Sequence, residues 1–390
     1  MDVYLEHVDN RIEETGADGF LIEAAGDDGN QRYLSGFNAH DPFISLYTGD
    51  AVAILIGGTD YSRATKESHA DAVRRHADYT AEGGESPDPK TEKYDAIIGF
   101  LREHDVSHVF VPEAFPLGTA RVLEQRDVTV AVDASESLLH DRTVKTEREV
   151  VAIEKTQRAT EAAMERAESI LREATIDEEV LTYGGDTLTG ARLKSEIETT
   201  LLREGAALQE TIVACGRDSA DPHGQTDGPL SPHQSILIDI FPEHIESGYH
   251  ADMTRTFVKG EPSEELETLY RDVHAALEAA LESLGPGVTG DTVCQEIHDM
   301  FRAAGHQTVL DDDGIDAGAL HSGGHGVGLE VHELPSVRPG GAAFEVGNVI
   351  TIEPGLYYPD IGGVRLEDLV EITETGYNNL TDFSTQLVIE

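Results

Sequence analysis

The sequence predicts an α+β protein in which a smaller α/β domain precedes a larger domain of mixed helices and strands. In residues 1–140, helix patterns alternate with strand patterns, which is typical of an α/β layer. From Lys145 to Ala174 the chain has neither glycine nor proline, and its apolar residues follow helical spacing. We therefore place the domain boundary just before this long helix, giving domains 1–140 and 141–390.

The elements follow from local patterns taken in chain order. In the first domain we expect helices at 4–17, 91–105 and 117–127, and strands at 18–24, 50–58, 107–112 and 128–133. In the second domain we expect further helices near 190–204, 262–285 and 290–304, and strands at 210–216, 235–242, 253–260, 348–358 and 364–373. Because these later strands do not alternate regularly with helices, the second domain is α+β rather than doubly wound.

The composition is strongly acidic, with 75 Asp and Glu against 28 Lys and Arg and a formal net charge of −47. Such a charge strains a compact fold by self-repulsion, whereas molar salt shortens the screening length to about 3 Å. Apolar residues make up 39% of the chain and are spread evenly, which argues against a disordered protein. We interpret the chain as a protein of a salt-accumulating halophile, for which nucleic acids and anionic membranes are poor partners.

Targeting and redox features are few. No run of about 18 apolar residues occurs, and the N-terminus lacks the basic and apolar regions of a signal peptide. Two cysteines, Cys215 and Cys294, are too few for a disulfide framework. These features predict a cytoplasmic, reduced protein.

Polar residues interrupt apolar strands at a few places. Asp239 follows three apolar residues, and Asp252 lies beyond a loop that predicts a hairpin bringing the two carboxylates together. Three histidines cluster in a glycine-rich segment, and two glutamates stand where a buried strand favours valine or isoleucine. The candidate ligand set is Asp239, Asp252, His325, Glu353 and Glu367. Carboxylates with one imidazole suit Mn²⁺, Co²⁺, Fe²⁺ or Zn²⁺ and exclude thiolate chemistry.

Charge balance favours two metal ions over one. Four carboxylates carry about four negative charges, which two divalent ions offset, whereas one ion leaves a surplus that is costly in a low-dielectric site. Two such ions lie about 3.5–4 Å apart and repel, so two carboxylates are expected to bridge them. Any single acid in so acidic a chain is more often a surface residue, and it is the joint occurrence that carries the prediction.

Four motifs, DIFP…YHADMTRTF, GHGVGLEVHELP, ITIEPGLYY and GVRLED, resemble in order the metal-site motifs of the pita-bread metallopeptidases. This family includes methionine aminopeptidase, aminopeptidase P and prolidase. The resemblance covers residues 145–390 strongly, and residues 1–140 resemble the creatinase-like N-terminal domain more loosely. It implies a C-terminal pita-bread catalytic domain. It also implies that Asp239 chelates one metal, that Asp252 and Glu367 bridge, and that His325 and Glu353 hold the second.

The resemblance implies further roles around the metals. His332 is expected to hydrogen-bond the scissile carbonyl or its tetrahedral intermediate, and His223 and His321 are expected to contact the substrate. Glu353 doubles as the proton shuttle for the attacking hydroxide, and Arg365 holds the carboxylates. The Asp239–Asp252 spacing is two residues longer than is usual in the family, and the extra length falls in the loop.

The additional N-terminal domain argues against methionine aminopeptidase, and the intact ligands argue against creatinase or a metal-free peptide-binding pseudoenzyme. Cleavage of Xaa-Pro bonds in proline-containing peptides remains, with hydrolysis of another C–N bond as a weaker alternative. Some archaeal prolidases carry an arginine where this chain has Ser336, although Arg338 is close by. We therefore favour an Xaa-Pro aminopeptidase, with Xaa-Pro dipeptidase (prolidase) as the alternative, and Mn²⁺ or Co²⁺ as the ions.

The segment GFNAHDPF in the first domain predicts an assembly role. It places His40 and Asp41 in an apolar-flanked loop that Pro42 stiffens. A surface turn is the simplest interpretation, but a loop from a symmetric partner can wall a small-peptide pocket. We expect a homodimer in which His40 or Asp41 approaches the partner's metal pocket.

Overall fold

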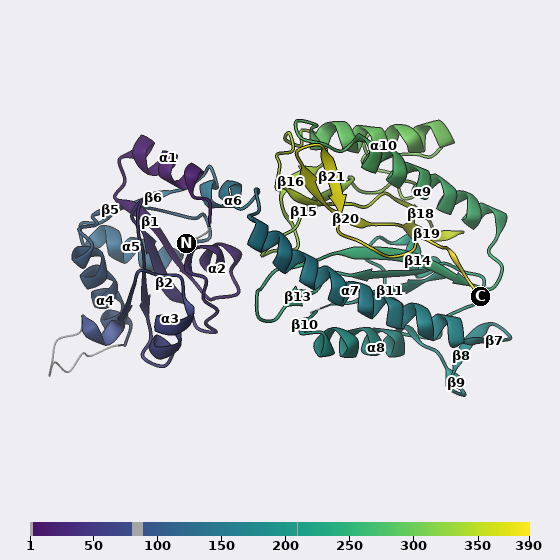
Figure 1. The fold of residues 1–390 in the computed structure, drawn as a ribbon, viewed down its shortest axis with the longest axis horizontal. Coiled ribbons are helices and arrows are strands. Elements are labelled where there is room, and N and C mark those ends of the chain that lie inside the picture. Colours follow the sequence, from purple (N-terminus) through teal and green to yellow (C-terminus); the bar gives the residue numbers. More distant parts are fainter. Residues whose placement is uncertain (1–2, 80–88, 209) are drawn as a thin grey trace. The chain divides into compact units, whose positions relative to one another are not determined.

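The computed structural model describes residues 3–79, 89–208 and 210–390 (Figure 1). It divides into two compact units, Met1–Arg142 and Thr143–Glu390. Both units combine helices with sheets, so the predicted mixed architecture is confirmed. The predicted boundary after residue 140 and the assembly role of the first part stay predictions. No helix among the described residues is long and apolar enough to cross a membrane.

The first unit is built on a six-stranded sheet with the order β4-β3-β2-β1-β5-β6. Its strands are β1 (Gly19–Ala24), β2 (Phe43–Tyr47), β3 (Val52–Ile56), β4 (Ala72–Arg75), β5 (His108–Val111) and β6 (Thr129–Val132). Its helices are α1 (Glu6–Thr15), α2 (Gly29–Ser35), α3 (Tyr61–Glu67), α4 (Pro89–Glu103), α5 (Leu117–Gln125) and α6 (Ser137–Asp141). The predicted strands here are all present. The sequence missed β2 because its five buried residues form a short apolar run without a diagnostic period.

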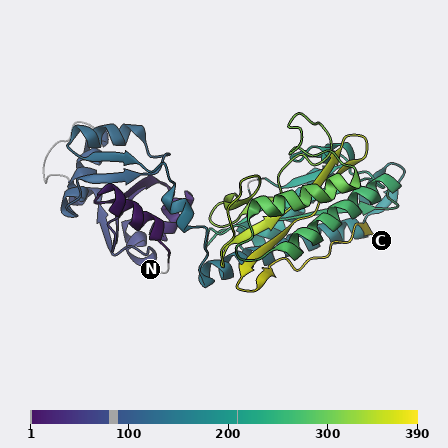
Figure 2. The same cartoon turned by 90° about the horizontal axis from the view of Figure 1, so that it is seen from above.

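The second unit repeats one arrangement, a pair of helices packed on a mainly antiparallel sheet. Helices α7 (Glu147–Glu173) and α8 (Gly190–Arg203) contact each other, as do α9 (Glu264–Ser283) and α10 (Gly290–Ala304). In Figure 1 the two pairs lie on opposite sides of the strands, and Figure 2 shows α9 and α10 side by side above them. The helices predicted at 190–204, 262–285 and 290–304 are confirmed.

Two main sheets carry the strands of this unit, with the orders β11-β12-β14-β22 and β16-β15-β17-β20-β21. The first contains β11 (Ile212–Cys215), β12 (Ile236–Ile240), β14 (Met253–Lys259) and β22 (Val388–Ile389). The second contains β15 (Gly324–Gly326), β16 (Glu333–Val337), β17 (Val349–Ile352), β20 (Asp368–Thr373) and β21 (Gly376–Asn379). Smaller pairings join β10 (Ala206–Ala207) to β13 (Glu243–His244), β18 (Gly355–Tyr358) to β19 (Gly362–Arg365), and β7 (Thr175–Asp177), β8 (Val180–Tyr183) and β9 (Asp186–Thr187) to one another.

Strand alternation decides which residues of β12 face the interior of the fold. Ile236, Ile238 and Ile240 belong to the apolar core beneath α7 and α8. Leu237 belongs to a separate cluster on the other face of the strand. Because successive side chains of a strand point to opposite faces, Asp239 shares the face of Leu237. The predicted hairpin is confirmed, since β12 pairs antiparallel with β14.

Two predicted strands are interrupted where the candidate glutamates stand. The pattern at 348–358 is divided into β17 and β18 by Glu353 and Pro354, and the pattern at 364–373 into β19 and β20 by Leu366 and Glu367. The prediction of continuous strands was wrong here. Pro354 has no N–H to donate to a ladder, and β18 and β19 form a separate two-stranded sheet, to which Gly318 adds an isolated bridge at Tyr357. The glutamates therefore lie at strand ends.

Candidate metal centre

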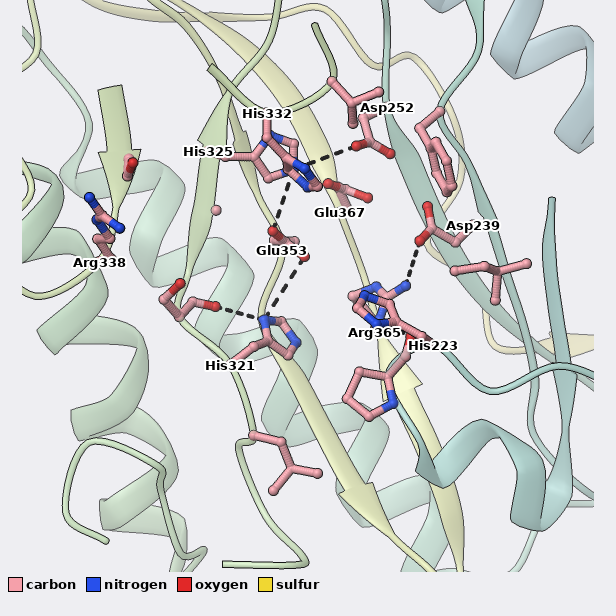
Figure 3. A pocket seen from close by; sticks show the side chains of 18 of the residues that line it. His223, Asp239, Asp252, His321, His325, His332, Arg338, Glu353, Arg365 and Glu367 are labelled. Atoms are coloured by element: carbon pink, nitrogen blue, oxygen red, sulfur yellow. Dashed lines mark hydrogen bonds and ion pairs between the residues drawn. The ribbon is translucent and has the colours of Figure 1, made fainter. Parts of the chain in front are cut away.

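A cavity of about 710 Å³ lies in the second unit, and all five candidate ligands line it. They come from different elements: Asp239 from β12, His325 from β15, Asp252 from the residue before β14, and the two glutamates from the strand breaks. The other predicted site residues of this unit that line the cavity are His223, His321, His332 and Arg365. Figure 3 shows the carboxylates and His325 gathered in one place.

Three of the ligands form a tight group. Asp252, His325 and Glu367 each offer a ligand atom within 4.8 Å of the other two. The Nε2 atom of His325 lies 3.6 Å from Oδ2 of Asp252 and 3.7 Å from Oε1 of Glu353. In Figure 3 these side chains point toward one another. The structure thus brings together the residues that the sequence selected.

The chemistry of the candidate ligand atoms fits a cation. Asp239 Oδ1 and Asp252 Oδ1 are buried and accept no hydrogen bond from the described residues. A buried acceptor without a partner carries a penalty of about 1–3 kcal/mol, and more when it is charged. Divalent ions would satisfy these oxygens, and an oxygen-rich set with one imidazole nitrogen suits such ions.

Electrostatics supports the same interpretation. Burial, followed by repulsion from Glu367, Asp239 and Glu353, raises the pKa of Asp252 well above its usual range. Burial and the charges of Glu353 and Asp239 likewise raise the pKa of Glu367. Without cations these carboxyls favour the protonated form, because like charges in a low dielectric repel. The group is therefore short of positive charge.

The tautomer of His325 suits a metal ligand. Its Nδ1 lies 3.1 Å from the carbonyl oxygen of Gly326, which can only accept, so Nδ1 carries the proton. Burial lowers the pKa of His325, which keeps the ring neutral and leaves a lone pair on Nε2 toward Asp252 and Glu353. A backbone carbonyl that fixes the tautomer in this way is typical of metal-binding histidines.

Arg365 and Thr254 hold the carboxylates in place. An Nη2 atom of Arg365 lies 2.6 Å from Oδ2 of Asp239. Thr254 Oγ1 donates to Glu367 Oε2 at 2.9 Å and accepts from Arg365 Nε at 3.0 Å. The two ligands are thus coupled through one guanidinium and one hydroxyl. Arg365 thus contacts a candidate ligand, its role there stays a prediction, and Thr254 was missed.

Tyr357 joins the arginine to His321, and the sequence analysis missed it. Its hydroxyl lies 2.8 Å from Arg365 Nη1 and 2.8 Å from His321 Nε2. His321 Nδ1 lies 2.7 Å from the carbonyl oxygen of Ser322, so Nε2 is free to accept from the hydroxyl. Burial raises the pKa of Tyr357 to about 12 and lowers that of His321. His321 Nδ1 also lies 3.9 Å from Glu353 Oε2.

The remaining predicted residues are less enclosed. His332 is exposed to the cavity, and its ring centroid lies 4.3 Å from that of His325. Loss of water around the ring, followed by the neighbouring His325, lowers the pKa of His332. His223 is exposed at the cavity. His40 and Asp41 lie exposed in a bend before β2 in the first unit, and their role at a partner's pocket stays a prediction.

Helix pairs on two mainly antiparallel sheets, with carboxylates and imidazoles converging in a cavity, are typical of a metal-dependent hydrolase. The model of metallopeptidase family M24 matches residues 151–374, and that of the creatinase/prolidase N-terminal domain matches residues 5–150. The chain therefore belongs to metallopeptidase family M24, and the predicted family and two-part fold are confirmed.

Several known proteins are similar to this chain, over all of its length or about two thirds of it. An Xaa-Pro dipeptidase of Pyrococcus horikoshii is 28% identical over 393 residues, with 100% of both chains covered. One of Lactobacillus delbrueckii subsp. lactis is 30% identical over 268 residues, covering 67% of this chain and 66% of the relative. Among solved structures, the prolidase of Pyrococcus horikoshii has a TM-score of 0.80 at 26% identity, covering 98% and 99% of the two chains. The X-Pro aminopeptidase of Thermotoga maritima also reaches 0.80 at 26% identity, covering 97% and 100%.

Proposed function

We propose that this metallopeptidase cleaves Xaa-Pro bonds with two divalent metal ions, Mn²⁺ or Co²⁺ being the favoured pair. The observation that carries the proposal is the convergence of Asp252, His325 and Glu367, beside carboxylate oxygens that accept no hydrogen bond within the described part of the chain. When bound, such ions polarise a carbonyl and lower the pKa of water, which supplies the nucleophile. The residues that would hold them are Asp239, Asp252, His325, Glu353 and Glu367.

The chain's own groups divide the remaining work. Glu353 lies within 4 Å of both His325 and His321, a position from which its carboxylate can take and return a proton. His332, exposed beside His325, donates a hydrogen bond to the carbonyl oxygen as negative charge develops there. His321, fixed by Tyr357, and His223 line the cavity where the substrate lies.

We further propose that the substrate is a dipeptide, in place of the longer peptide that the sequence favoured. Two of the relatives described above are Xaa-Pro dipeptidases, and this supports the dipeptidase alternative better than the aminopeptidase that the sequence favoured. Ser336 and Arg338 both line the cavity. Because they are two positions apart, their side chains point to the same side of the extended backbone. Arg338 is exposed and forms no ion pair with the described residues, and in Figure 3 it lies apart from the carboxylates. A guanidinium there can bind the free carboxylate of a dipeptide's proline.

The test compares Ala-Pro with Ala-Pro-Ala for the wild type and for Arg338→Ala, after chelation and reconstitution with Mn²⁺ or Co²⁺. We expect Ala-Pro to be the better substrate. Loss of a hydrogen bond to a charged group, worth about 1.5–3 kcal/mol, should lower kcat/KM on Ala-Pro by about 10–100-fold and spare Ala-Pro-amide. Arg217→Ala, on an exposed arginine outside the cavity lining, is the control. Equal or faster cleavage of Ala-Pro-Ala would restore the aminopeptidase assignment.

A further inference from the structure

The bend 327–332 joins β15 to β16 and carries His332 at its end. Its first residue is tied to β17, because Val327 N–H donates to Val349 O at 3.0 Å, and among the described residues few backbone hydrogen bonds hold the rest of the bend. Gly328 N–H donates to Glu330 O at 3.1 Å, and His250 N–H donates to Gly328 O at 2.7 Å. An exposed histidine on such a bend needs additional support if its ring is to stay in one place beside the metal ligands.

A buried carboxylate supplies that support from inside the bend. Glu333 Oε1 accepts from the backbone N–H of Glu330 at 3.1 Å, and Oε2 lies 2.9 Å from Lys145 Nζ. Both side chains of this pair are only 1% exposed. A Cβ on Gly328 would lie 2.4 Å from Glu333 Oε2, so the glycine leaves the space that the carboxylate occupies.

Lys145 reaches the bend from a distant part of the chain. It precedes α7, and its backbone N–H donates to Gly347 O at 2.8 Å, just before β17. The pair therefore links the segment before α7 to the bend and, through Gly347, to the strand that leads to Glu353. A buried ion pair adds little net stability because both charges lose water, whereas removing one partner is costly. The Lys145–Glu333 pair therefore fixes the position of the two side chains more than it adds stability.

We propose that Lys145 and Glu333 are positioning residues that hold His332 for catalysis. Neither lines the cavity, so neither contacts the substrate there. Glu333 is the next residue after His332, and its side chain is anchored on both oxygens. Fixing Glu333 fixes the backbone from which the His332 ring projects, and misplacement of a reacting group by about 1 Å can lower a rate by about 100-fold. This inference rests on the proposed function of His332.

The kinetic test uses Glu333→Gln, which keeps the size and an acceptor for Glu330 N–H but removes the charge. We expect kcat on Ala-Pro to fall by about 10–100-fold, with KM within about 3-fold and metal content unchanged. In a His332→Ala background the same change should lower kcat by less than about 2-fold, because residues that act through one another are not additive. Fully multiplicative losses would overturn the proposal.

A second readout needs no substrate. Amide hydrogen exchange of residues 327–333 should rise about 10-fold or more in Glu333→Gln and in Lys145→Met, with exchange in β17 unchanged. The control is Glu196→Gln, which removes a partly exposed pair with Arg166 (2.7 Å) on α7 and α8. Unchanged exchange in the bend would overturn the positioning role even in an active enzyme. Failure of the wild type to cleave any Xaa-Pro substrate would instead overturn the proposed function.

A folding defect does not end the test. If a single variant fails to fold, the double variant Lys145→Met with Glu333→Met removes both buried charges and is expected to fold. It should show the same loss of kcat and the same faster exchange in the bend. Wild-type kcat with wild-type exchange in the double variant would show that the pair does not position His332.

Discussion

The second unit contains two halves of similar construction that contribute different chemistry. The first half, with α7 and α8 on the β11-β12-β14 sheet, supplies Asp239 and Asp252 to the candidate metal centre. The second half, with α9 and α10 on the β15-β17-β20 sheet, supplies His325 and two glutamates. His321 and His332 also come from the second half. The carboxylates are therefore shared, whereas the imidazoles closest to the centre come from one half.

Contacts between the two halves hold the candidate metal centre together. Arg365 of the second half binds Asp239 of the first, and Thr254 of the first binds Glu367 of the second. Each half thus orients a ligand that the other half supplies. We infer that metal binding depends on both halves about equally, while the chemistry of the carbonyl depends mainly on the second.

The largest effect should come from removing a central carboxylate of either half. Asp252→Ala and Glu367→Ala are each expected to abolish Xaa-Pro hydrolysis and to lower the bound metal, because two cations are then poorly screened from each other. Metal analysis beside steady-state kinetics checks this. The matched control is Glu371→Ala, on β20 four residues after Glu367, which should keep both the activity and the bound metal. Wild-type turnover with two metals bound in either variant would show that the site assignment is wrong.

Removing an imidazole of the second half should separate binding from chemistry. His332→Ala is expected to keep its metals and lose about 10²–10³-fold in kcat, as when one oxyanion donor is removed. Metal content and kcat measured on one preparation distinguish a metal ligand from a hydrogen-bond donor to the substrate. A variant that loses metal but keeps residual rate would identify His332 as a ligand, and the roles of His325 and His332 would need exchanging.

The surface acids should respond to salt in a way that the buried carboxylates do not. With a net charge of −47, self-repulsion is strong in dilute buffer and is screened in molar KCl. We expect the melting temperature and kcat/KM to rise between about 50 mM and several molar KCl, with activity falling more than about 10-fold at the low end. An unchanged melting temperature and full activity at the low salt concentration would contradict the halophile interpretation.

A hydrogen-bonded link within the second half should have a smaller effect. Tyr357→Phe removes the hydroxyl that joins Arg365 to His321. Arg365 Nη1 keeps its hydrogen bond to Pro222 O, whereas His321 Nε2 loses this partner, at a cost of about 1–2 kcal/mol. We expect kcat to fall by about 5–30-fold with the metals retained. Tyr358→Phe is a close control, because its hydroxyl lies 2.8 Å from His306 and does not line the cavity. Equal effects of the two changes would show that the loss is one of general stability.

The sequence predicted those features that leave a local pattern. The helices of the second unit follow long apolar periods, and Asp239 and Glu367 stand out because acids interrupt apolar strands. Tyr357 stands in the same motif as Glu353, ITIEPGLYY, but nothing in the sequence singles it out, because a buried tyrosine has no distinctive spacing. The Lys145–Glu333 pair spans 188 positions, so only the folded chain reveals it. The strand breaks depend on tertiary pairing in the same way.

The smallest expected effect tests a residue outside both halves. His40 is exposed on the first unit, between Ala39, which is buried, and Asp41, which is also exposed. If the chain forms a homodimer in which this bend walls the partner's pocket, His40→Ala should remove contact area without touching a metal ligand. We expect KM for Ala-Pro to rise about 3–10-fold, equivalent to about 1 kcal/mol of lost binding, with kcat, metal content and the dimer unchanged. Asp50→Ala, at another exposed acid of the same unit, should leave KM unchanged. A fully active monomer in molar salt, measured by light scattering during turnover, would exclude a partner's contribution, and the site would then be complete within one chain.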